Sequence, residues 1–216
     1  MKLVTLDFEG TLVNFQWKLT EAVDEVLSLL AREGVHRDYF DTMNYAAIYN
    51  KVQSEGEKWG FPSGQLTDLV DSVYDKYDLD ACTRWEPVQG MFDVLDRLKK
   101  YKVALVSNIG HKGMTFILKE FGLEDSFGLV LNRNDLQFIK PDKEGLLKAI
   151  AWADVSKNQA IHVGDSLSDL HAARNAGVKS AIVLGGENDA ASIIKETPDL
   201  LMENLSELPY RLSQLD

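Results

Sequence analysis

Three short apolar stretches, each followed at once by polar side chains, constrain the fold of this chain most strongly. They span residues 2–7 (KLVTLD), 102–108 (KVALVSN) and 159–165 (QAIHVGD). Short runs that are almost continuously apolar predict strands that are buried on both faces, as strands of parallel sheets are. Residues 180–186 have the same form, and residues 128–134 are a weaker example.

Helical patterns lie between these predicted strands. Apolar residues recur at intervals of three and four in residues 87–101, 111–123 and 143–155. A fourth helical pattern spans residues 168–178, and Gly177 is expected to end that helix. Strands that alternate with helices through short links are typical of an α/β fold. The right-handed crossover rule then predicts a doubly wound, mostly parallel sheet, which is a Rossmann-like core.

Residues 15–85 interrupt this alternation, because they contain no convincing strand. Helical patterns span residues 19–34, 37–59 and 64–79. We therefore predict an all-helical domain, residues 15–85, inserted into a core that consists of residues 1–14 and 86–216.

Two features of the predicted insert bear on ligand binding. Its aromatic residues Phe15, Trp17, Tyr45 and Tyr49 are expected in its interior. The glycine-rich loop 53–64 is the stretch expected to face the core, either contacting a ligand through Lys58 or Trp59 or serving only as a turn between helices.

The composition excludes some classes of partner. Asp and Glu number 34 against 23 Lys and Arg, a net charge of −11, which argues against a nucleic-acid partner. The single cysteine, Cys82, permits no intramolecular disulfide, and because no long apolar stretch with a cleavage site is seen we expect neither a signal peptide nor a membrane-spanning helix. We expect a cytoplasmic protein without a membrane partner, and the oligomeric state stays open.

Polar side chains end each of the three best predicted strands. Asp7 ends the first, Ser107 and Asn108 the second, and Asp165 the third. Asp, Ser and Asn commonly begin turns, so each position alone is weak evidence for a site. Ligands of open parallel sheets bind beyond the carboxyl ends of the strands, and the convergence of all three predicts a site there.

The acids of this predicted site would repel one another without a cation. Asp7 and Glu9 are two residues apart, and Asp165 and Asp169 follow the third strand. Mg²⁺ takes oxygen ligands and offsets such repulsion. A carboxylate can also attack phosphorus, and a second carboxyl group can transfer protons, so Asp7 and Glu9 suit two different catalytic roles.

Four segments, in order, resemble the signatures of the haloacid dehalogenase superfamily. They are residues 7–11 (DFEGT), the Ser107–Asn108 pair, Lys140 in IKPDKEG, and residues 164–169 (GDSLSD). The core resembles phosphoglycolate phosphatase-like members through residues 140–150 and 162–178. The helical insert resembles the type-one cap of that superfamily.

The resemblance implies a role for each matching residue. It makes Asp7 the nucleophile and Glu9 the general acid and base. It implies that Mg²⁺ is held by Asp7, Asp165 and the Glu9 backbone carbonyl, with Asp169 beside them or on a metal-bound water. The residues implied to contact the transferring phosphoryl group are Thr11, Ser107, Asn108 and Lys140. Outside this resemblance Lys140 could be only a solvated lysine near a helix start, and His111 and His162 are given no role.

The implied activity is that of a phosphoric monoester hydrolase. The chain resembles Mg²⁺-dependent phosphatases that act on small phosphorylated metabolites through an aspartyl-phosphate. The usual signature has Asp where this chain has Glu9, one methylene longer. The alternatives are a phosphomutase, a 2-haloacid dehalogenase, which typically has no acid at that position, and a non-catalytic protein that binds a phosphorylated ligand.

Overall fold

The computed structural model describes residues 1–42 and 44–215. Within these residues one six-stranded sheet has the order β3-β2-β1-β4-β5-β6, and every pair of neighbours is parallel. The strands are β1 Leu3–Leu6, β2 Lys102–Val106, β3 Leu129–Leu131, β4 Ala160–Gly164, β5 Lys179–Val183 and β6 Leu200–Met202. This sheet confirms the predicted α/β fold and adds β6, which the sequence analysis did not predict.

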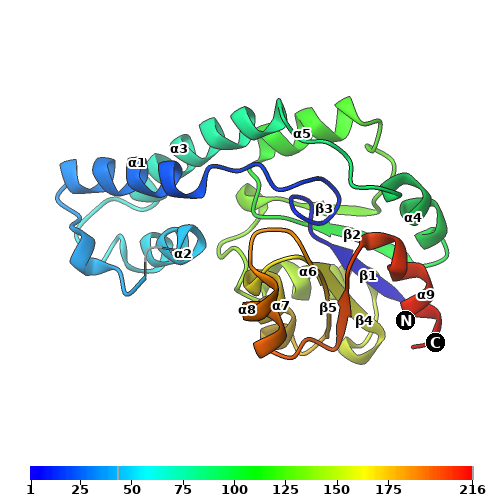
Figure 1. Cartoon of the computed structure of the whole chain (residues 1–216). Coiled ribbons are helices and arrows are strands. Elements are labelled where there is room, and N and C mark those ends of the chain that lie inside the picture. Colours follow the sequence, from blue (N-terminus) through cyan, green and yellow to red (C-terminus); the bar gives the residue numbers. More distant parts are fainter. Residues whose placement is uncertain (43, 216) are drawn as a thin grey trace.

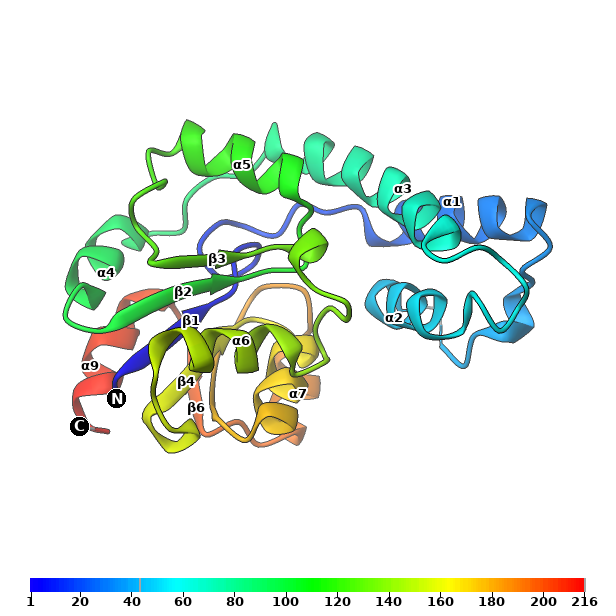
Figure 2. The ribbon, with the colours of Figure 1, turned by 180° about the vertical axis from the view of Figure 1, so that it is seen from behind.

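Helices cover both faces of the sheet (Figures 1 and 2). Val4, Leu6 and Leu105 belong to one apolar cluster, which includes buried residues of α4 (Met91–Leu98), α5 (His111–Glu120) and α9 (Leu208–Ser213). Leu3 and Ala104 belong to a second cluster with α6 (Glu144–Ala153) and α7 (Leu167–Ala176). Successive strand residues point to opposite faces, so two buried faces explain the nearly continuous apolar runs.

The remaining elements of the core are short. They are the helix α8 (Ala190–Lys195) and three 3₁₀ turns, η2 (Arg133–Asp135), η3 (Lys157–Gln159) and η4 (Leu205–Glu207).

A helical insert, residues 19–82, lies between β1 and β2 and projects to one side of the sheet (Figure 1). It contains α1 (Leu19–Arg32), the 3₁₀ turn η1 (Arg37–Tyr39), α2 (Tyr45–Glu55) and α3 (Gln65–Cys82). The single helix expected over residues 37–59 is wrong. Asn44 caps α2 by accepting hydrogen bonds from the backbone of Ala46 and Ala47, so the helix begins later; residue 43 lies outside the described residues.

The two connections between insert and core run side by side. The Asn14 amide donates to Glu86 O at 3.0 Å, and the Glu86 amide donates to the Asn14 side chain at 2.8 Å. Farther along, α3 packs against α1 and α2 at one end and against α5 of the core at the other. The division of the chain at residues 15 and 85 stays a prediction.

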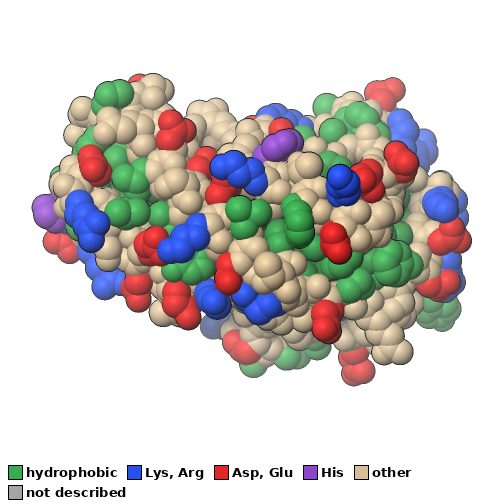
Figure 3. All heavy atoms as spheres, turned by 90° about the horizontal axis from the view of Figure 1, so that it is seen from above, with side chains coloured by type: hydrophobic (Ala, Val, Ile, Leu, Met, Phe, Trp, Pro, Cys, Tyr) green, Lys and Arg blue, Asp and Glu red, His purple; other side chains and the backbone are tan. Residues whose placement is uncertain are grey.

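The surface carries charges of both signs. On the face viewed in Figure 3, acidic and basic side chains are interspersed with small apolar patches. Within the described residues, no helix has both the length and the apolar character that crossing a membrane requires.

Candidate active site

The site lies where the strand order reverses, between β1 and β4. Asp7 follows β1, and its amide donates a 2.8 Å hydrogen bond to Val163 O of β4. Asp165 follows β4 directly. Open α/β sheets bind ligands in the crevice beyond the strand ends at such a reversal, so the topology places both carboxylates at the expected position.

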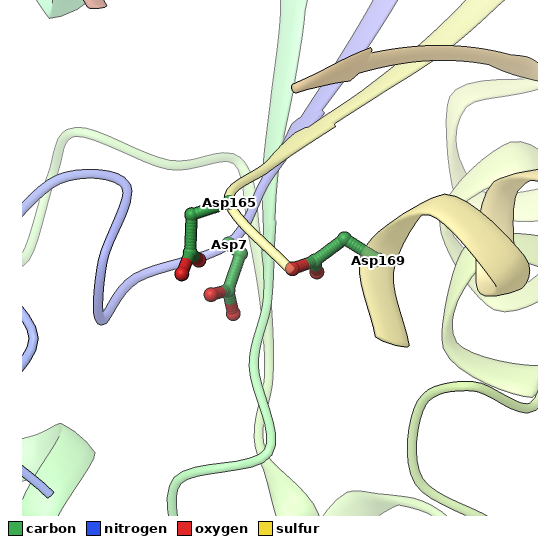
Figure 4. Close-up of side chains that lie close together, drawn as sticks. All are labelled: Asp7, Asp165 and Asp169. Atoms are coloured by element: carbon green, nitrogen blue, oxygen red, sulfur yellow. The ribbon is translucent and has the colours of Figure 1, made fainter. Parts of the chain in front are cut away.

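Three carboxylates meet at this point, and we call them the carboxylate cluster. One oxygen of each of Asp7, Asp165 and Asp169 lies within 4.8 Å of the other two. All three side chains are buried, and Figure 4 shows them converging from the ends of β1 and β4 and from the first turn of α7. Ser166 begins α7, and its hydroxyl donates to Asp169 Oδ2 at 2.6 Å, which fixes that carboxylate.

Lys140 bridges two members of the cluster. Its Nζ donates to Asp7 Oδ1 and to Asp169 Oδ1, each at 2.6 Å. Burial opposes the charge of the ammonium group, but Asp169 and Asp7 outweigh burial and hold the pKa of Lys140 above its ordinary value. The side chain is 3 % exposed, so the reading of Lys140 as a solvated lysine is wrong.

One lysine does not offset three buried carboxylates. Burial, followed by the charges of Asp169 and Asp7, raises the pKa of Asp165 well above its ordinary value. Burial also raises the pKa of Asp7, whereas Lys140 and His162 overcome burial and keep the pKa of Asp169 far below its usual range. Ionising all three carboxylates beside one lysine would leave a surplus of negative charge, and a hard cation would offset that cost.

The shape and chemistry of the cluster fit Mg²⁺. Every donor in it is a carboxylate oxygen, the ligand type that Mg²⁺ prefers. Gly10 and Gly186 lie so close to the Asp165 carboxylate that a Cβ on either would collide with it, and Gly164 lies equally close to Asp169. These glycines let the backbone pack around the carboxylates as no larger residue could.

Glu9 lies beside the cluster and joins both connections to the helical insert. Its Oε1 accepts hydrogen bonds from the amides of Gln16 and Trp17, each at 2.7 Å, and from Trp85 Nε1 at 2.8 Å. Burial raises the pKa of Glu9 to about 7, against the opposing effect of these hydrogen bonds. A carboxyl group with that pKa can both donate and accept a proton near neutral pH.

The predicted phosphate-binding residues have other contacts as well. Thr11 is buried and donates to Asp165 Oδ1 at 3.2 Å. The side-chain amide of Asn108 makes two hydrogen bonds with the Lys140 backbone. Nδ2 donates to Lys140 O, and Oδ1 accepts from Lys140 N, each at 3.0 Å. Ser107 lines the cavity beside Asp7, and its Oγ accepts from the Ile109 amide at 3.3 Å. Contact of these side chains with a phosphoryl group stays a prediction.

His162 has partners that the sequence analysis did not assign. It lies within β4, is fully buried, and places Nε2 3.0 Å from Asp169 Oδ1 and Nδ1 2.9 Å from Thr5 Oγ1. A histidine inside an otherwise apolar strand was the available signal, because a buried imidazole needs polar partners.

The cavity beside Asp7 encloses about 500 Å³, part of it open to solvent. Phe15, Trp17 and Tyr45 line it and also pack in or against the apolar cluster that includes the buried residues of the insert, so they are interior aromatics with one side toward the cavity. Within the described residues the lining includes none of the loop 53–64. Lys58 pairs with Glu55 in that loop, and Trp59 packs on Tyr39 and Phe40.

Arg133 and three acids of α3 form a second charged group, which we call the Arg133 cluster. The guanidinium is 1 % exposed and pairs with Asp71 at 2.5 Å, Asp75 at 2.7 Å and Asp78 at 2.8 Å. Its Nη1 also donates to Asn108 O at 3.0 Å. The cluster links the helical insert to the loop that follows β2.

Comparison with known proteins places this geometry in a family. The sequence model of haloacid dehalogenase-like hydrolases matches residues 4–183. The chain is 29% identical over 213 residues to phosphoglycolate phosphatase 1 of Pseudomonas aeruginosa, covering 96% of this chain and 78% of that protein. It is 29% identical over 216 residues to pyrophosphatase PpaX of Bacillus cereus, covering 99% and 97%.

Solved structures share the fold. A predicted phosphoglycolate phosphatase from Haemophilus somnus superposes with a TM-score of 0.68 at 21% identity, covering 99% of this chain and 98% of that one. L-2-haloacid dehalogenase from Xanthobacter autotrophicus gives 0.62 at 19% identity, with both chains fully covered. The family match spans most of the chain and all four segments that carry the resemblance, and the chain belongs to the haloacid dehalogenase-like hydrolase family.

Proposed function

We propose that the chain is a Mg²⁺-dependent phosphatase that hydrolyses a small phosphorylated metabolite through an aspartyl-phosphate on Asp7. The observation that carries the proposal is the contact between Asp7 and Lys140 inside the carboxylate cluster. A buried carboxylate held by a fixed cation at the mouth of a cavity is suited to attack an electrophile rather than to stabilise the fold.

The relatives support a phosphoric monoester hydrolase. The two relatives described above are named phosphoglycolate phosphatase and pyrophosphatase, and the similarity covers 78% and 97% of their lengths. The acid at position 9 distinguishes this chain from the dehalogenase pattern, which typically has no acid there.

The first half of the proposed reaction transfers the phosphoryl group to the protein. A carboxylate oxygen of Asp7 forms a bond to phosphorus while the bond from phosphorus to the leaving-group oxygen breaks. Protonated Glu9 gives its proton to that oxygen, so the product leaves as an alcohol. Lys140 supplies fixed positive charge next to Asp7, where negative charge gathers on the phosphoryl oxygens.

The second half releases phosphate. Glu9, now ionised, removes a proton from a water molecule, and the water oxygen bonds to phosphorus as the bond to Asp7 breaks. Phosphate leaves, and both carboxyl groups return to their starting states. Asp7, Asp165, Asp169 and the Glu9 carbonyl are the groups that would hold Mg²⁺, which when bound supplies positive charge to the carboxylates and phosphoryl oxygens.

The proposal is tested by substituting the nucleophile. Asp7→Asn should lower phosphate release from a panel of phosphorylated metabolites by at least about a thousandfold in the presence of Mg²⁺, with unchanged circular dichroism. Asp125→Asn makes the same change at an exposed position and should retain full activity. Retained turnover in Asp7→Asn would refute the nucleophile assignment.

The same screen separates the alternatives. Glu9→Gln should lower kcat far more than it changes KM, because the amide cannot transfer the proton. Conversion of one phosphosugar into another without phosphate release would indicate a phosphomutase, and halide release from a 2-haloacid without Mg²⁺ would indicate a dehalogenase. Ligand binding with no turnover on any substrate would favour a non-catalytic protein.

The domain organisation and location belong to the same proposal. We infer that residues 15–85 act as a cap over a core formed by residues 1–14 and 86–216, with hinges where Glu9 binds the two connections. A cytoplasmic location agrees with the single, buried Cys82, which forms no disulfide within the chain.

A further inference from the structure

The cavity beside Asp7 has an excess of acidic side chains. Among the described residues that line it, two are basic, Arg133 and Lys140. Six are acidic: Asp7, Glu9, Asp78, Asp165, Asp169 and Glu187. A divalent cation in the carboxylate cluster would still leave the lining acidic before a phosphoryl group adds its own negative charge.

Four of the five N–H donors of Arg133 are already bonded, which leaves little capacity for an anionic ligand. Each of its three guanidinium nitrogens bonds a different carboxylate of α3, and Nη1 also donates to Asn108 O. The side chain is 1 % exposed, so a ligand would have to displace an α3 carboxylate to reach it. Because three carboxylates surround this one cation, this part of the cavity wall also has a net negative charge.

Lys140 is likewise already paired with carboxylates. It bonds Asp7 and Asp169 and is the cation nearest the reacting phosphoryl group in the proposed mechanism. A second anionic group, at the far end of a substrate's leaving group, would therefore have no cation of its own among the described residues of this cavity.

The rest of the wall combines aromatic and acidic side chains with uncharged polar ones, among them Ser166 and Ser168. Phe15, Trp17 and Tyr45 offer aromatic surface, with Trp17 and Tyr45 in contact at a ring separation of 5.1 Å. Three acids of the lining, Glu9, Asp165 and Glu187, form no ion pair with any described Lys, Arg or His, and Glu187 is the one of them on the loop after β5. Its backbone amide is bonded to Asp165 at 2.6 Å, which places it next to the carboxylate cluster.

We propose that this cavity selects phosphomonoesters whose leaving group is uncharged or cationic, and discriminates against leaving groups that carry a second anion. This inference rests on the proposed phosphatase function and narrows its substrate class. Moving a carboxylate out of water into a wall whose charged groups are mostly acids has a large cost, which a hydroxyl such as that of Ser168 offsets less than a cation would. An ammonium group would instead find Glu187 and the ring faces, both of which attract cations.

A series of substrates with leaving groups of equal length tests the inference. The probes are phosphoglycolate, 2-hydroxyethyl phosphate and phosphoethanolamine, which end in a carboxylate, a hydroxyl and an ammonium group. With Mg²⁺ present, kcat/KM for phosphoglycolate should be at least tenfold below that of the other two, a difference of about 1.4 kcal/mol.

The outcomes separate this inference from the proposed function. Phosphoglycolate hydrolysed as fast as 2-hydroxyethyl phosphate, or faster, would overturn the inference and leave the phosphatase function supported. No phosphate release from these probes or from a wider phosphomonoester panel would defeat the proposed function and the inference with it.

A charge substitution adds an internal check. Burial raises the pKa of Glu187 to about 7, so the comparison is made at pH 8, where Glu187→Gln should raise the ratio of kcat/KM for phosphoglycolate over phosphoethanolamine several-fold because it removes one repelling charge. Glu124→Gln makes the same change at an exposed position outside the cavity and should leave that ratio unchanged. An equal ratio in wild type and Glu187→Gln would contradict the electrostatic basis of the inference.

Discussion

Replacing Arg133 by methionine should destabilise the protein more than any exposed charge substitution. Arg133→Met keeps a long apolar side chain but removes the cation from Asp71, Asp75 and Asp78. Asp78 is 2 % exposed, and burial already raises its pKa despite the neighbouring guanidinium. Removing one partner of a buried ion pair typically costs about 3–5 kcal/mol, and that is the loss expected here.

Urea denaturation at pH 7, followed by circular dichroism, measures this loss as a change in the free energy of unfolding. Arg211→Met is the matched control, because Arg211 pairs with Glu207 one helical turn away and is 43% exposed. An exposed pair of this kind contributes about 1 kcal/mol or less. Arg133→Lys should fall between the two, because it keeps the charge and loses the fork that reaches three carboxylates.

A double-mutant cycle isolates the pairwise interaction. Asp78→Asn removes the most buried carboxylate of the Arg133 cluster, so Arg133→Met should cost less in that background than in the wild type. The coupling free energy should lie in the range of about 0.5–3 kcal/mol found for residues in one network. An Arg133→Met variant no less stable than Arg211→Met, or a cycle without coupling, would refute the view that this cluster holds the insert to the core.

Two further predictions concern single groups. Glu144 accepts from the amides of Gln137 and Phe138 and pairs with Lys148, which outweigh burial and lower its pKa below 4.5. Ionised Glu144 therefore contributes its full stabilisation above about pH 4.5 and loses it as the carboxylate is protonated at lower pH. The difference in the free energy of unfolding between wild type and Glu144→Gln should accordingly narrow as the pH falls below that value. A difference that widens in acid would contradict this sign. Burial and the charges of Asp78 and Glu9 raise the pKa of Cys82 to about 12. The native protein should therefore react with a thiol reagent at neutral pH at least tenfold more slowly than the urea-unfolded protein. Equal rates would contradict the burial of Cys82.

The fold and the centre of the site could be predicted because their signals are local. Strands that are buried on both faces have uninterrupted apolar sequences. The polar residues that follow these strands lie at the same edge of the parallel sheet, independently of how the helices pack. Asp7 therefore lies close to Lys140 and Asp165 as expected, although it is more than a hundred residues from either in the sequence. The two edge strands have three residues each and give weak patterns: β3 was predicted only as the weaker example at residues 128–134, and β6 was not predicted.

The second charged group could not be predicted, because each half has an ordinary local explanation. Arg133 lies at the polar end of the weaker predicted strand, residues 128–134, and the acids at 71, 75 and 78 are typical of the solvated side of a helix. Their spacing does place three carboxylates on one stripe of α3, which was the available signal. Only the packing of α3 onto the core shows that this stripe faces a single buried guanidinium.

The glutamate at position 9, where related signatures have Asp, has a structural explanation in the two connections to the insert. Its Oε1 lies 2.7–2.8 Å from three donors, two amides of the first connection and the Trp85 indole of the second. Aspartate is shorter by one carbon–carbon bond, about 1.5 Å, which would stretch these contacts beyond hydrogen-bonding distance.

Glu9→Asp should therefore keep an acid in the site and loosen both connections. Each lost hydrogen bond is worth about 0.5–1.5 kcal/mol, so hydrogen exchange at the amides of Gln16 and Trp17 should accelerate by roughly tenfold. Glu9→Gln retains the side-chain length and the Oε1 acceptor, so exchange at those amides should stay slow even though proton transfer is lost. If Glu9→Asp left both amides as protected as in the wild type, the extra methylene would need another explanation.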